Sequence, residues 1–284
     1  MSATTPRFSL VLPIHDDEAL LASTLPELAR AFPPSDAEIV VACNGCRDDS
    51  AAVARSVEGV TVIELDRASK VAALNAADMT ATSFPRVYLD VDVRVDHAAI
   101  RAVVDRLRSG DVHAAAPRLH VDVSKSSRLV ASYYRIWSRL PWVRDEMVGS
   151  GFYALTAEGR GRFTDFPDEG ADDLWVSAHF GPGERQVVDG VSFSVDASRT
   201  IRQVVRRKAR VLAANRRIAP LTTDLPGRSS NRAGAFSVVR DQPALLPHFV
   251  VYSIVTVTAE LRARRMVRRD DRSWAGDRGS EPAR

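Results

Sequence analysis

The chain has 284 residues, of which 45% are hydrophobic and 26% are charged, and its formal net charge is +3. This composition excludes wholesale disorder, and the length suffices to bury the core of one large domain or two small ones. A charge so close to balance, without an RNA- or DNA-binding motif, argues against nucleic acid as a partner. Two cysteines are too few for a disulfide framework, and no secretory signal is recognisable, so we expect a cytoplasmic protein.

The first part of the chain alternates short β-branched runs with helical patterns. Strands are predicted at 8–14, 38–42, 60–65 and 86–90, and helices at 17–31, 48–57, 70–79 and 97–107. This alternation is typical of a parallel sheet covered by helices on both faces. Ligands of such sheets bind beyond the carboxyl ends of the strands, which directs attention to residues 15–18, 43–49 and 90–92.

The alternation is looser in the second part. We expect a strand at 112–121, a glycine-marked turn entering a strand at 149–154, and helices at 125–140, 172–180 and 199–217. Residues 220–240 have no periodicity and are predicted to form a loop, followed by a helix at about 244–268 and a disordered tail.

The strongest single feature is Asp90-Val91-Asp92 at the end of a predicted strand. Two carboxylates separated by one residue can hold a hard divalent cation that bridges the phosphates of a nucleotide. The alternative, that these aspartates only cap the following helix, stays open on this feature alone.

Six segments, taken together and in order, resemble the motifs of family 2 glycosyltransferases. They are 12–18 (LPIHDDE), 40–50 (VVACNGCRDDS), 69–75 (SKVAALN), 90–92 (DVD), 149–151 (GSG) and 172–175 (DDLW). The resemblance covers about residues 8–217 and implies a GT-A fold. That fold is a three-layer α/β/α sandwich with a mostly parallel central sheet, here with a C-terminal helical segment added.

The resemblance also implies a division of the chain. A donor-binding half would occupy residues 1–115, and an acceptor-binding and catalytic half residues 116–217. A flexible loop at 218–240 would then lead to the C-terminal helix and basic tail at 241–284.

The implied reaction moves a sugar, with inversion, from a nucleotide-diphosphate donor to a hydroxyl of a lipid, glycan or small metabolite. UDP-sugar is the default donor, and Mn²⁺ or Mg²⁺ the expected cofactor. The residues to which the resemblance gives donor contacts are Pro13, His15, Asp17, Asn44, Lys70 and Asp90. Asp92, with Asp90, would hold the metal, and Asp173 or its neighbour Asp172 would be the general base. The acceptor side would include Gly149, Ser150, Gly151 and Trp175.

Three departures from the family pattern matter. His15 replaces the usual tyrosine, and Cys43 lies where many members have aspartate. The basic segment 199–217 lacks the tryptophan of the "QxxRW" motif, which argues against a processive synthase. Arg206 and Arg210 of this segment are candidates for contacts to the diphosphate. A solvated helix face or a membrane-facing patch explains these arginines equally well.

The predicted C-terminal helix joins an apolar stretch to a cluster of arginines. This pattern fits a segment lying on an anionic membrane, whereas a dimer interface or packing against the enzyme body explains the apolar residues equally well. The longest apolar run, near 249–259, is shorter than the roughly 20 residues of a spanning helix. The oligomeric state is left open.

Three other functions stay open on the sequence. Cys43 and Cys46, between a strand and a helix, resemble a thioredoxin-like redox pair. A strand-end DxD also occurs in haloacid-dehalogenase-like phosphatases, although there it ends the first strand. A non-catalytic nucleotide-binding module is the third alternative.

Overall fold

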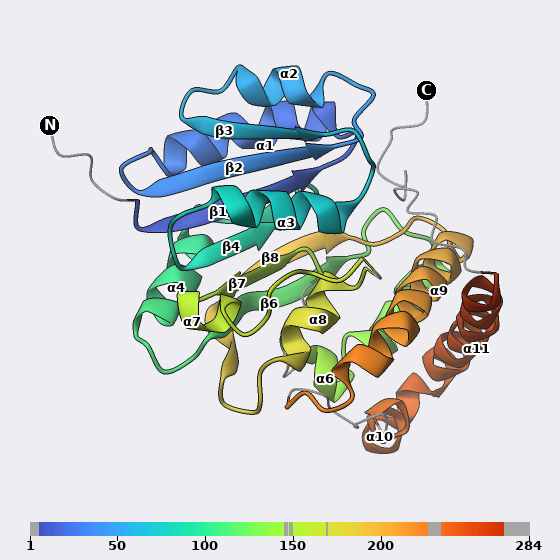
Figure 1. The fold of residues 1–284 in the computed structure, drawn as a ribbon. Helices are drawn as coiled ribbons and strands as arrows, with labels where there is room; N and C mark the ends of the chain where they lie inside the picture. The colour runs from blue at the N-terminus through green and yellow to red at the C-terminus, as the bar shows by residue number, and fades with distance from the viewer. Residues whose placement is uncertain (1–5, 145–146, 148–149, 169, 227–233, 270–284) are drawn as a thin grey trace, which may run out of the picture.

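The computed structural model describes residues 6–144, 147, 150–168, 170–226 and 234–269. Within these residues, eight strands form one sheet in the order β3-β2-β1-β4-β7-β6-β8-β5 (Figure 1). The strands are β1 (Phe8–Ile14), β2 (Ala37–Asn44), β3 (Val60–Leu65), β4 (Arg86–Leu89), β5 (Arg94–Val95), β6 (Ala114–Asp122), β7 (Phe152–Leu155) and β8 (Arg185–Asp196).

The first four long strands are parallel, as their connecting helices require. β1 pairs with β2 and β4, and β2 pairs with β3, all in parallel. Their carboxyl ends therefore lie at one edge of the sheet. β7 lies between β4 and β6 and is antiparallel to both, whereas β8 is parallel to β6. The expected mostly parallel α/β sheet is confirmed.

The helices of the first half pack on both faces of the sheet, as predicted. They are α1 (Glu18–Ala31), α2 (Ser50–Arg55), α3 (Lys70–Thr80) and α4 (His97–Arg108). Local capping explains two of their starts. The hydroxyl of Ser69 accepts a hydrogen bond from the Ala72 N–H, and Asp96 accepts one from the Ala98 N–H.

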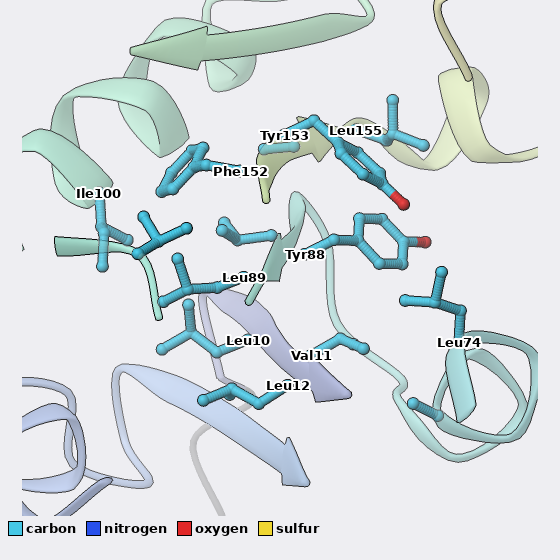
Figure 2. Packing of buried hydrophobic residues seen from close by; sticks show 14 of the residues in the cluster. Leu10, Val11, Leu12, Leu74, Tyr88, Leu89, Ile100, Phe152, Tyr153 and Leu155 are labelled. Atoms are coloured by element: carbon cyan, nitrogen blue, oxygen red, sulfur yellow. The ribbon is translucent and has the colours of Figure 1, made fainter. Parts of the chain in front are cut away.

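The core lies on both faces of the central strands β1, β4 and β7. Figure 2 shows Leu89 and Phe152 directed toward Ile100 of α4, while Tyr88 and Tyr153 occupy the opposite face, toward Leu74 of α3. The two tyrosine rings stack with their centroids 4.7 Å apart. Both rings are only 2% exposed, so β4 and β7 are held in a fixed relation just below the end of the sheet.

The second half adds mostly helices. They are α5 (Arg128–Trp137), α6 (Pro141–Arg144), α7 (Ala157–Arg160), α8 (Asp172–Ala178), α9 (Ile201–Ile218), α10 (Gly234–Asp241) and α11 (Leu246–Arg268). Two short 3₁₀ turns, η1 (Ala219–Thr222) and η2 (Pro243–Leu245), complete the described elements.

Helices α9 and α11 lie side by side at the end of the molecule that is coloured orange and red in Figure 1. Small side chains permit the close approach, because Ala209 and Ala213 of α9 meet Ala259 and Ala263 of α11, all four fully buried. Among the described residues, Pro243–Arg268 is long and apolar enough to cross a membrane by length and composition.

Two predictions about the second half were wrong. The twelve-residue strand β8 was missed, although Val191, Phe193 and Val195 alternate with polar residues as a half-buried strand does. The expected loop over 218–240 contains η1 and most of α10, because Val238 is buried against α5 and α6 and orders that segment. Residues 227–233 and the tail from 270 onward lie outside the described residues.

Lys208 of α9 gives the helical layer a specific dependence on pH. Its ammonium lies 5.5 Å and 5.4 Å from the ring centroids of Tyr133 and Tyr252 and donates to the Tyr133 hydroxyl. Burial lowers the pKa of Lys208 to about 8. Between that value and about 10.4, the pKa of an unfolded lysine, the unfolded chain binds more protons. The contribution of Lys208 to stability therefore rises with pH across this window.

We therefore expect Lys208→Met to remove part of the rise in Tm between about pH 7 and pH 10. Thermal unfolding followed by circular dichroism at a series of pH values measures this effect. Arg206→Met, an exposed change on the same helix, is the matched control and should leave the slope unchanged. Equal slopes for the wild type and Lys208→Met would contradict the assignment.

Candidate functional site

Carboxylates from three strand ends gather at the carboxyl edge of the parallel sheet. Asp17 follows β1, Asp48 follows β2, and Asp90 and Asp92 follow β4. Burial, followed by the charges of Asp92, Asp48 and Asp90, raises the pKa of Asp17 to about 6 against the opposing effect of His15. The edge of the sheet therefore concentrates more negative charge than its own residues neutralise.

Lys70 is the cation that joins the two halves of this site. Its ammonium lies 2.9 Å from Asp90 Oδ1 and 3.3 Å from Asp172 Oδ2. Burial alone would lower the pKa of Lys70, but attraction to Asp172 and Asp90 outweighs it and raises the pKa. Lys70 thus stays charged and connects α3, the end of β4 and the start of α8.

Asp172 and Asp173, the acid pair, begin helix α8 directly after a residue with a strained backbone. Ala171, the residue before the helix, has a positive φ of 57°, which is uncommon for a residue other than glycine. Asp172 accepts a hydrogen bond from the Tyr153 hydroxyl at 3.2 Å and is the partner of Lys70. Asp173 accepts from the backbone N–H of Leu174 at 2.7 Å.

The two members of the pair therefore differ in their surroundings. The side chain of Asp172 is 12% exposed and bound to both Lys70 and Tyr153. Burial, followed by the adjacent charge of Asp172, raises the pKa of Asp173, while Lys70 and backbone hydrogen bonds oppose the rise. Asp172 is held by its neighbours, whereas Asp173 is a buried carboxylate whose pKa is raised, as the pKa of a general base often is.

The glycine turn before β7 lies against Asp90. The carbonyl of Gly151 accepts a hydrogen bond from the Asp90 N–H at 2.8 Å. Gly151 has a φ of +94°, and a Cβ there would lie 2.7 Å from Val93 Cγ2 and 3.1 Å from Asp90 Oδ2. Glycine is thus required for both backbone conformation and space. Ser150 has a φ of 47°, and the expected residue Gly149 lies outside the described residues.

Asn44 joins neighbouring segments of the site. It is buried, and its amide donates to the Ile14 carbonyl at 2.7 Å while its side-chain oxygen accepts from the Ser69 N–H at 2.9 Å. His15 lies 2.6 Å from the Asn44 carbonyl through Nδ1. Pro13, in β1, is half-buried. Asn44 therefore fixes the positions of the β1 and β2 ends and of the α3 start.

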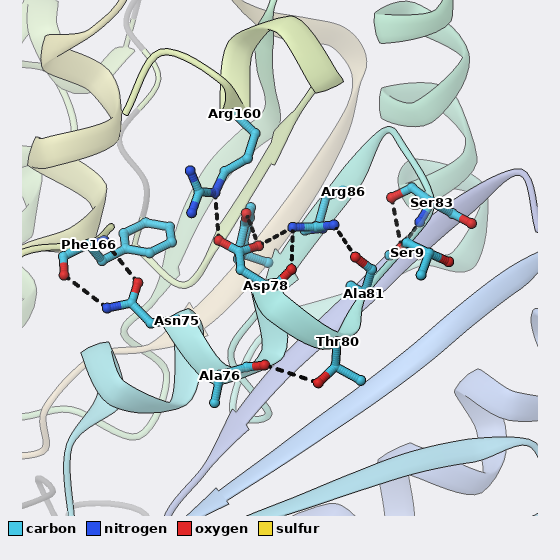
Figure 3. Close-up of polar contacts among 12 residues, drawn as sticks. Ser9, Asn75, Ala76, Asp78, Thr80, Ala81, Ser83, Arg86, Arg160 and Phe166 are labelled. Atoms are coloured by element: carbon cyan, nitrogen blue, oxygen red, sulfur yellow. Dashed lines mark hydrogen bonds and ion pairs between the residues drawn. The ribbon is translucent and has the colours of Figure 1, made fainter. Parts of the chain in front are cut away.

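The residues that support the site from inside the core were not predicted from the sequence. Asp78 of α3 is buried and forms ion pairs with Arg86 and Arg160, and it accepts from the Tyr88 hydroxyl at 2.7 Å (Figure 3). Tyr88 in turn stacks on Tyr153, the residue that contacts Asp172. A buried charge must be paired, so an acidic residue in an apolar helical pattern was the available signal.

Asn75, the last residue of the 69–75 segment, also has a structural role. Its side chain exchanges two hydrogen bonds with the backbone of Phe166, at 3.1 Å and 2.9 Å, as Figure 3 shows. These bonds attach α3 to the segment that leads into α8.

The remaining expected residues lie on helices α8 and α9. The ring of Trp175 packs 4.6 Å from His179 and 6.1 Å from Phe163, between their centroids. Helix α9 passes close to the segment before α8, since a Cβ at Gly170 would lie 3.9 Å from that of Ala214. Arg210 precedes Ala214 by one turn on the same face of α9, whereas Arg206 is exposed.

Two groups of residues offer carboxylates to a divalent cation. Asp16, Cys46 and Asp48 have ligand atoms within 4.8 Å of one another. The two carboxylates of this group already accept hydrogen bonds within the protein. Asp16 accepts one from the Arg47 N–H, and Asp48 accepts from Ser50 and from the Glu18 N–H. A thiol is also a poor ligand for a hard cation.

Asp90 and Asp92 fit such an ion better. The carboxylate of Asp92 is exposed at the edge of the sheet, and burial, together with the charges of Asp92 and Asp172, raises the pKa of Asp90 against the effect of Lys70. Oxygen ligands in a region of excess negative charge are the surroundings that Mn²⁺ or Mg²⁺ prefers.

The redox alternative is not supported by the thiols. Burial raises the pKa of Cys43 to about 12, and the neighbouring Cys46 contributes to the rise. A reactive cysteine needs the opposite shift, because the thiolate is the nucleophile. Cys43 is instead a buried residue of β2.

Residues 9–149, about half of the chain, match the family described as Glycosyl transferase family 2. The chain is also 31% identical, over 116 residues, to the glycosyltransferase AglD of Haloferax volcanii. That alignment covers 38% of this chain and 19% of the relative, so the chain spans about a fifth of the length of the curated protein it matches.

Two solved structures are similar over most of the chain. The mannosyltransferase PcManGT of Pyrobaculum calidifontis, in complex with GDP-Man and Mn²⁺, has a TM-score of 0.66 and 17% identity, covering 94% of this chain and 88% of that one. Glucosyl-3-phosphoglycerate synthase of Mycobacterium tuberculosis, in complex with Mn²⁺ and UDP-Glc, has a TM-score of 0.54 and 20% identity, with coverages of 79% and 81%. At these identities the likeness establishes the fold, and the expected GT-A type is confirmed. The phosphatase alternative is therefore wrong.

The tight turn at Gly151 yields a testable consequence for stability. We expect Gly151→Ala to cost about 1–3 kcal/mol in the free energy of unfolding, because it combines a strained φ with a clash beside Asp90. Gly190→Ala is the matched control, since Gly190 has a φ of +77° but open space around it. Urea unfolding of both variants separates the two effects. Equal losses would show that the close contact with Asp90 contributes nothing.

Proposed function

The chain belongs to glycosyl transferase family 2 through residues 9–149, and from this premise we propose that it is a metal-dependent, inverting transferase. It moves a sugar from a nucleotide-diphosphate donor to a hydroxyl acceptor. The observation that carries the proposal is the contact of Lys70 with Asp90 and Asp172, which brings the strand-end carboxylates of the first half against the acid pair of the second.

The donor would lie across the carboxyl edge of β1, β2 and β4. Asp92 and Asp90 would hold Mn²⁺ or Mg²⁺, with Asp17 beside them and with Pro13 and His15 bordering the nucleoside. Such a cation supplies positive charge that stabilises the diphosphate leaving group. Lys70 would retain its charge next to that diphosphate and compensate Asp90 when no donor is bound. Arg210 is the better placed of the two candidate arginines on α9.

Asp173 would be the general base for the acceptor hydroxyl. Its neighbour Asp172 is already bound to Lys70 and Tyr153 and would position the start of α8. A base on the side opposite the leaving group favours direct displacement, and with it inversion at the anomeric carbon. The glycine turn and Trp175 would border the acceptor.

The identity of the sugar donor remains to be measured. The two similar structures carry GDP-Man and UDP-Glc, so they support a nucleotide-sugar but do not favour one base. UDP-sugar is therefore the first donor to assay. We also propose that the protein is cytoplasmic. A donor panel assayed for Mn²⁺-dependent release of the nucleoside diphosphate tests the function. Release from none of the donors, with or without acceptor extracts, would favour the non-catalytic alternative.

The metal site is tested by Asp92→Asn. We expect the affinity for UDP or GDP in the presence of Mn²⁺ to fall by more than tenfold, because loss of even an outer-shell partner of a metal costs about 10–100-fold in affinity. Isothermal calorimetry with Mn²⁺, and again with EDTA, measures the change. Asp16→Asn, in the competing cluster, should bind as the wild type does. The reverse pattern would move the metal to Asp16, Cys46 and Asp48.

The base is tested by comparing Asp173→Asn with Asp172→Asn. We expect Asp173→Asn to keep donor affinity and to lose about 10²–10⁴-fold in kcat, the usual contribution of general base catalysis. Asp172→Asn removes a partner of Lys70 and should lower the Tm and the donor affinity as well. Near-normal turnover by Asp173→Asn would exclude it as the base.

A further inference from the structure

Helix α11 presents a continuous apolar stripe to solvent. Its members recur every three or four residues, which places them on one face of the helix. They are Leu246, Val250, Ile254, Val257 and Leu261, between 51% and 62% exposed. Only 11% of the most apolar window of this helix is buried. Water is a poor solvent for such a surface, so the stripe is suited to contact with another apolar phase.

The same face continues into positive charge. Arg264 and Arg265 follow Leu261 by three and four residues, and Arg268 follows them by one further turn, all exposed. Glu260 is the single acidic residue of α11, and it is paired with Arg216 and Arg264. The stripe therefore ends in a net cationic patch rather than in a neutral surface.

The opposite face of α11 packs against the rest of the protein. Ala259 and Ala263 pack against α9, and Val255 is buried among residues of α5 and α9. Tyr252 lies over the Lys208 ammonium. Crossing a bilayer would strip these contacts. It would leave Lys208 and Arg216 of α9 without their partners and carry Glu260 into hydrocarbon, which is costly. The helix can instead keep its packing and bury the stripe while lying parallel to a surface.

We propose that α11 is an interfacial helix that binds the surface of an anionic lipid bilayer, with the stripe in the acyl boundary and the arginines at the headgroups. The charge at the end of the stripe favours this occupant, because a second copy of the chain would bring two cationic patches together or leave them outside the contact. Since α9 borders both α11 and the segment before α8, the acid pair would lie one helix behind the membrane-facing surface.

The proposal is tested with the full chain and vesicles of phosphatidylcholine with or without phosphatidylglycerol. The stripe variant is Ile254→Ser with Val257→Ser, and the charge variant is Arg264→Gln, Arg265→Gln and Arg268→Gln. Met79→Ser is the matched control, because Met79 is a 90% exposed apolar residue on α3. Circular dichroism and nucleotide binding confirm that each variant is folded, and light scattering gives the oligomeric state without lipid.

We expect the wild type and Met79→Ser to co-sediment with the anionic vesicles and only weakly with pure phosphatidylcholine. Partitioning of the stripe variant should fall by about tenfold or more, and the charge variant should lose the preference for anionic lipid. Absence of binding by the wild type, or unchanged binding by the stripe variant, would overturn the proposal. A lipid-free dimer that the stripe variant dissociates would assign the stripe to a second copy instead.

Discussion

The ion pairs of Lys70 join two segments of the site that are far apart in the chain. One ammonium satisfies Asp90 at the end of β4 and Asp172 at the start of α8, two segments that are more than 80 residues apart in the chain. Without it, the carboxylates at this edge would repel one another, as the raised pKa of Asp17, caused by burial and then by its acidic neighbours, already indicates. An edge with this excess of negative charge suits a diphosphate only together with a divalent cation, because the cation supplies the positive charge that the protein lacks there.

The geometry at that edge depends on buried residues below it. Asp78 pairs with two arginines and fixes the Tyr88 hydroxyl, Tyr88 stacks on Tyr153, and Tyr153 donates to Asp172. This sequence of contacts transmits the rigidity of the core to the acid pair, while Ala171 carries backbone strain at the same point. For the base that we propose, a small displacement would cost a large part of the turnover, which accounts for the buried structure that supports these two carboxylates.

The elements with a strong local signal could be predicted from the chain alone. Regular alternation predicted β1 to β4 and α1 to α4, although not the two-residue strand β5, and the rule for ligand sites at strand ends singled out Asp17, Asp90 and Asp92 before any geometry was known. The residues that support Asp172 could not be predicted, because Tyr153 and Asp78 act through contacts that only the tertiary fold creates. α10 was missed for a related reason, because its order comes from packing against distant elements rather than from local propensity. β8, by contrast, does carry a local signal in the alternation of Val191, Phe193 and Val195 with polar residues.

We propose that Asp92 and Asp90, the ion-pair partner of Lys70, hold a nucleoside diphosphate through a divalent cation. Crystals soaked with Mn²⁺ and UDP or GDP, measured at the manganese absorption edge, test it most directly. We expect an anomalous peak next to the Asp92 carboxylate, with the diphosphate between that peak and the α9 side of the site. A peak within the Asp16, Cys46 and Asp48 cluster, or a nucleotide bound away from Lys70, would contradict it.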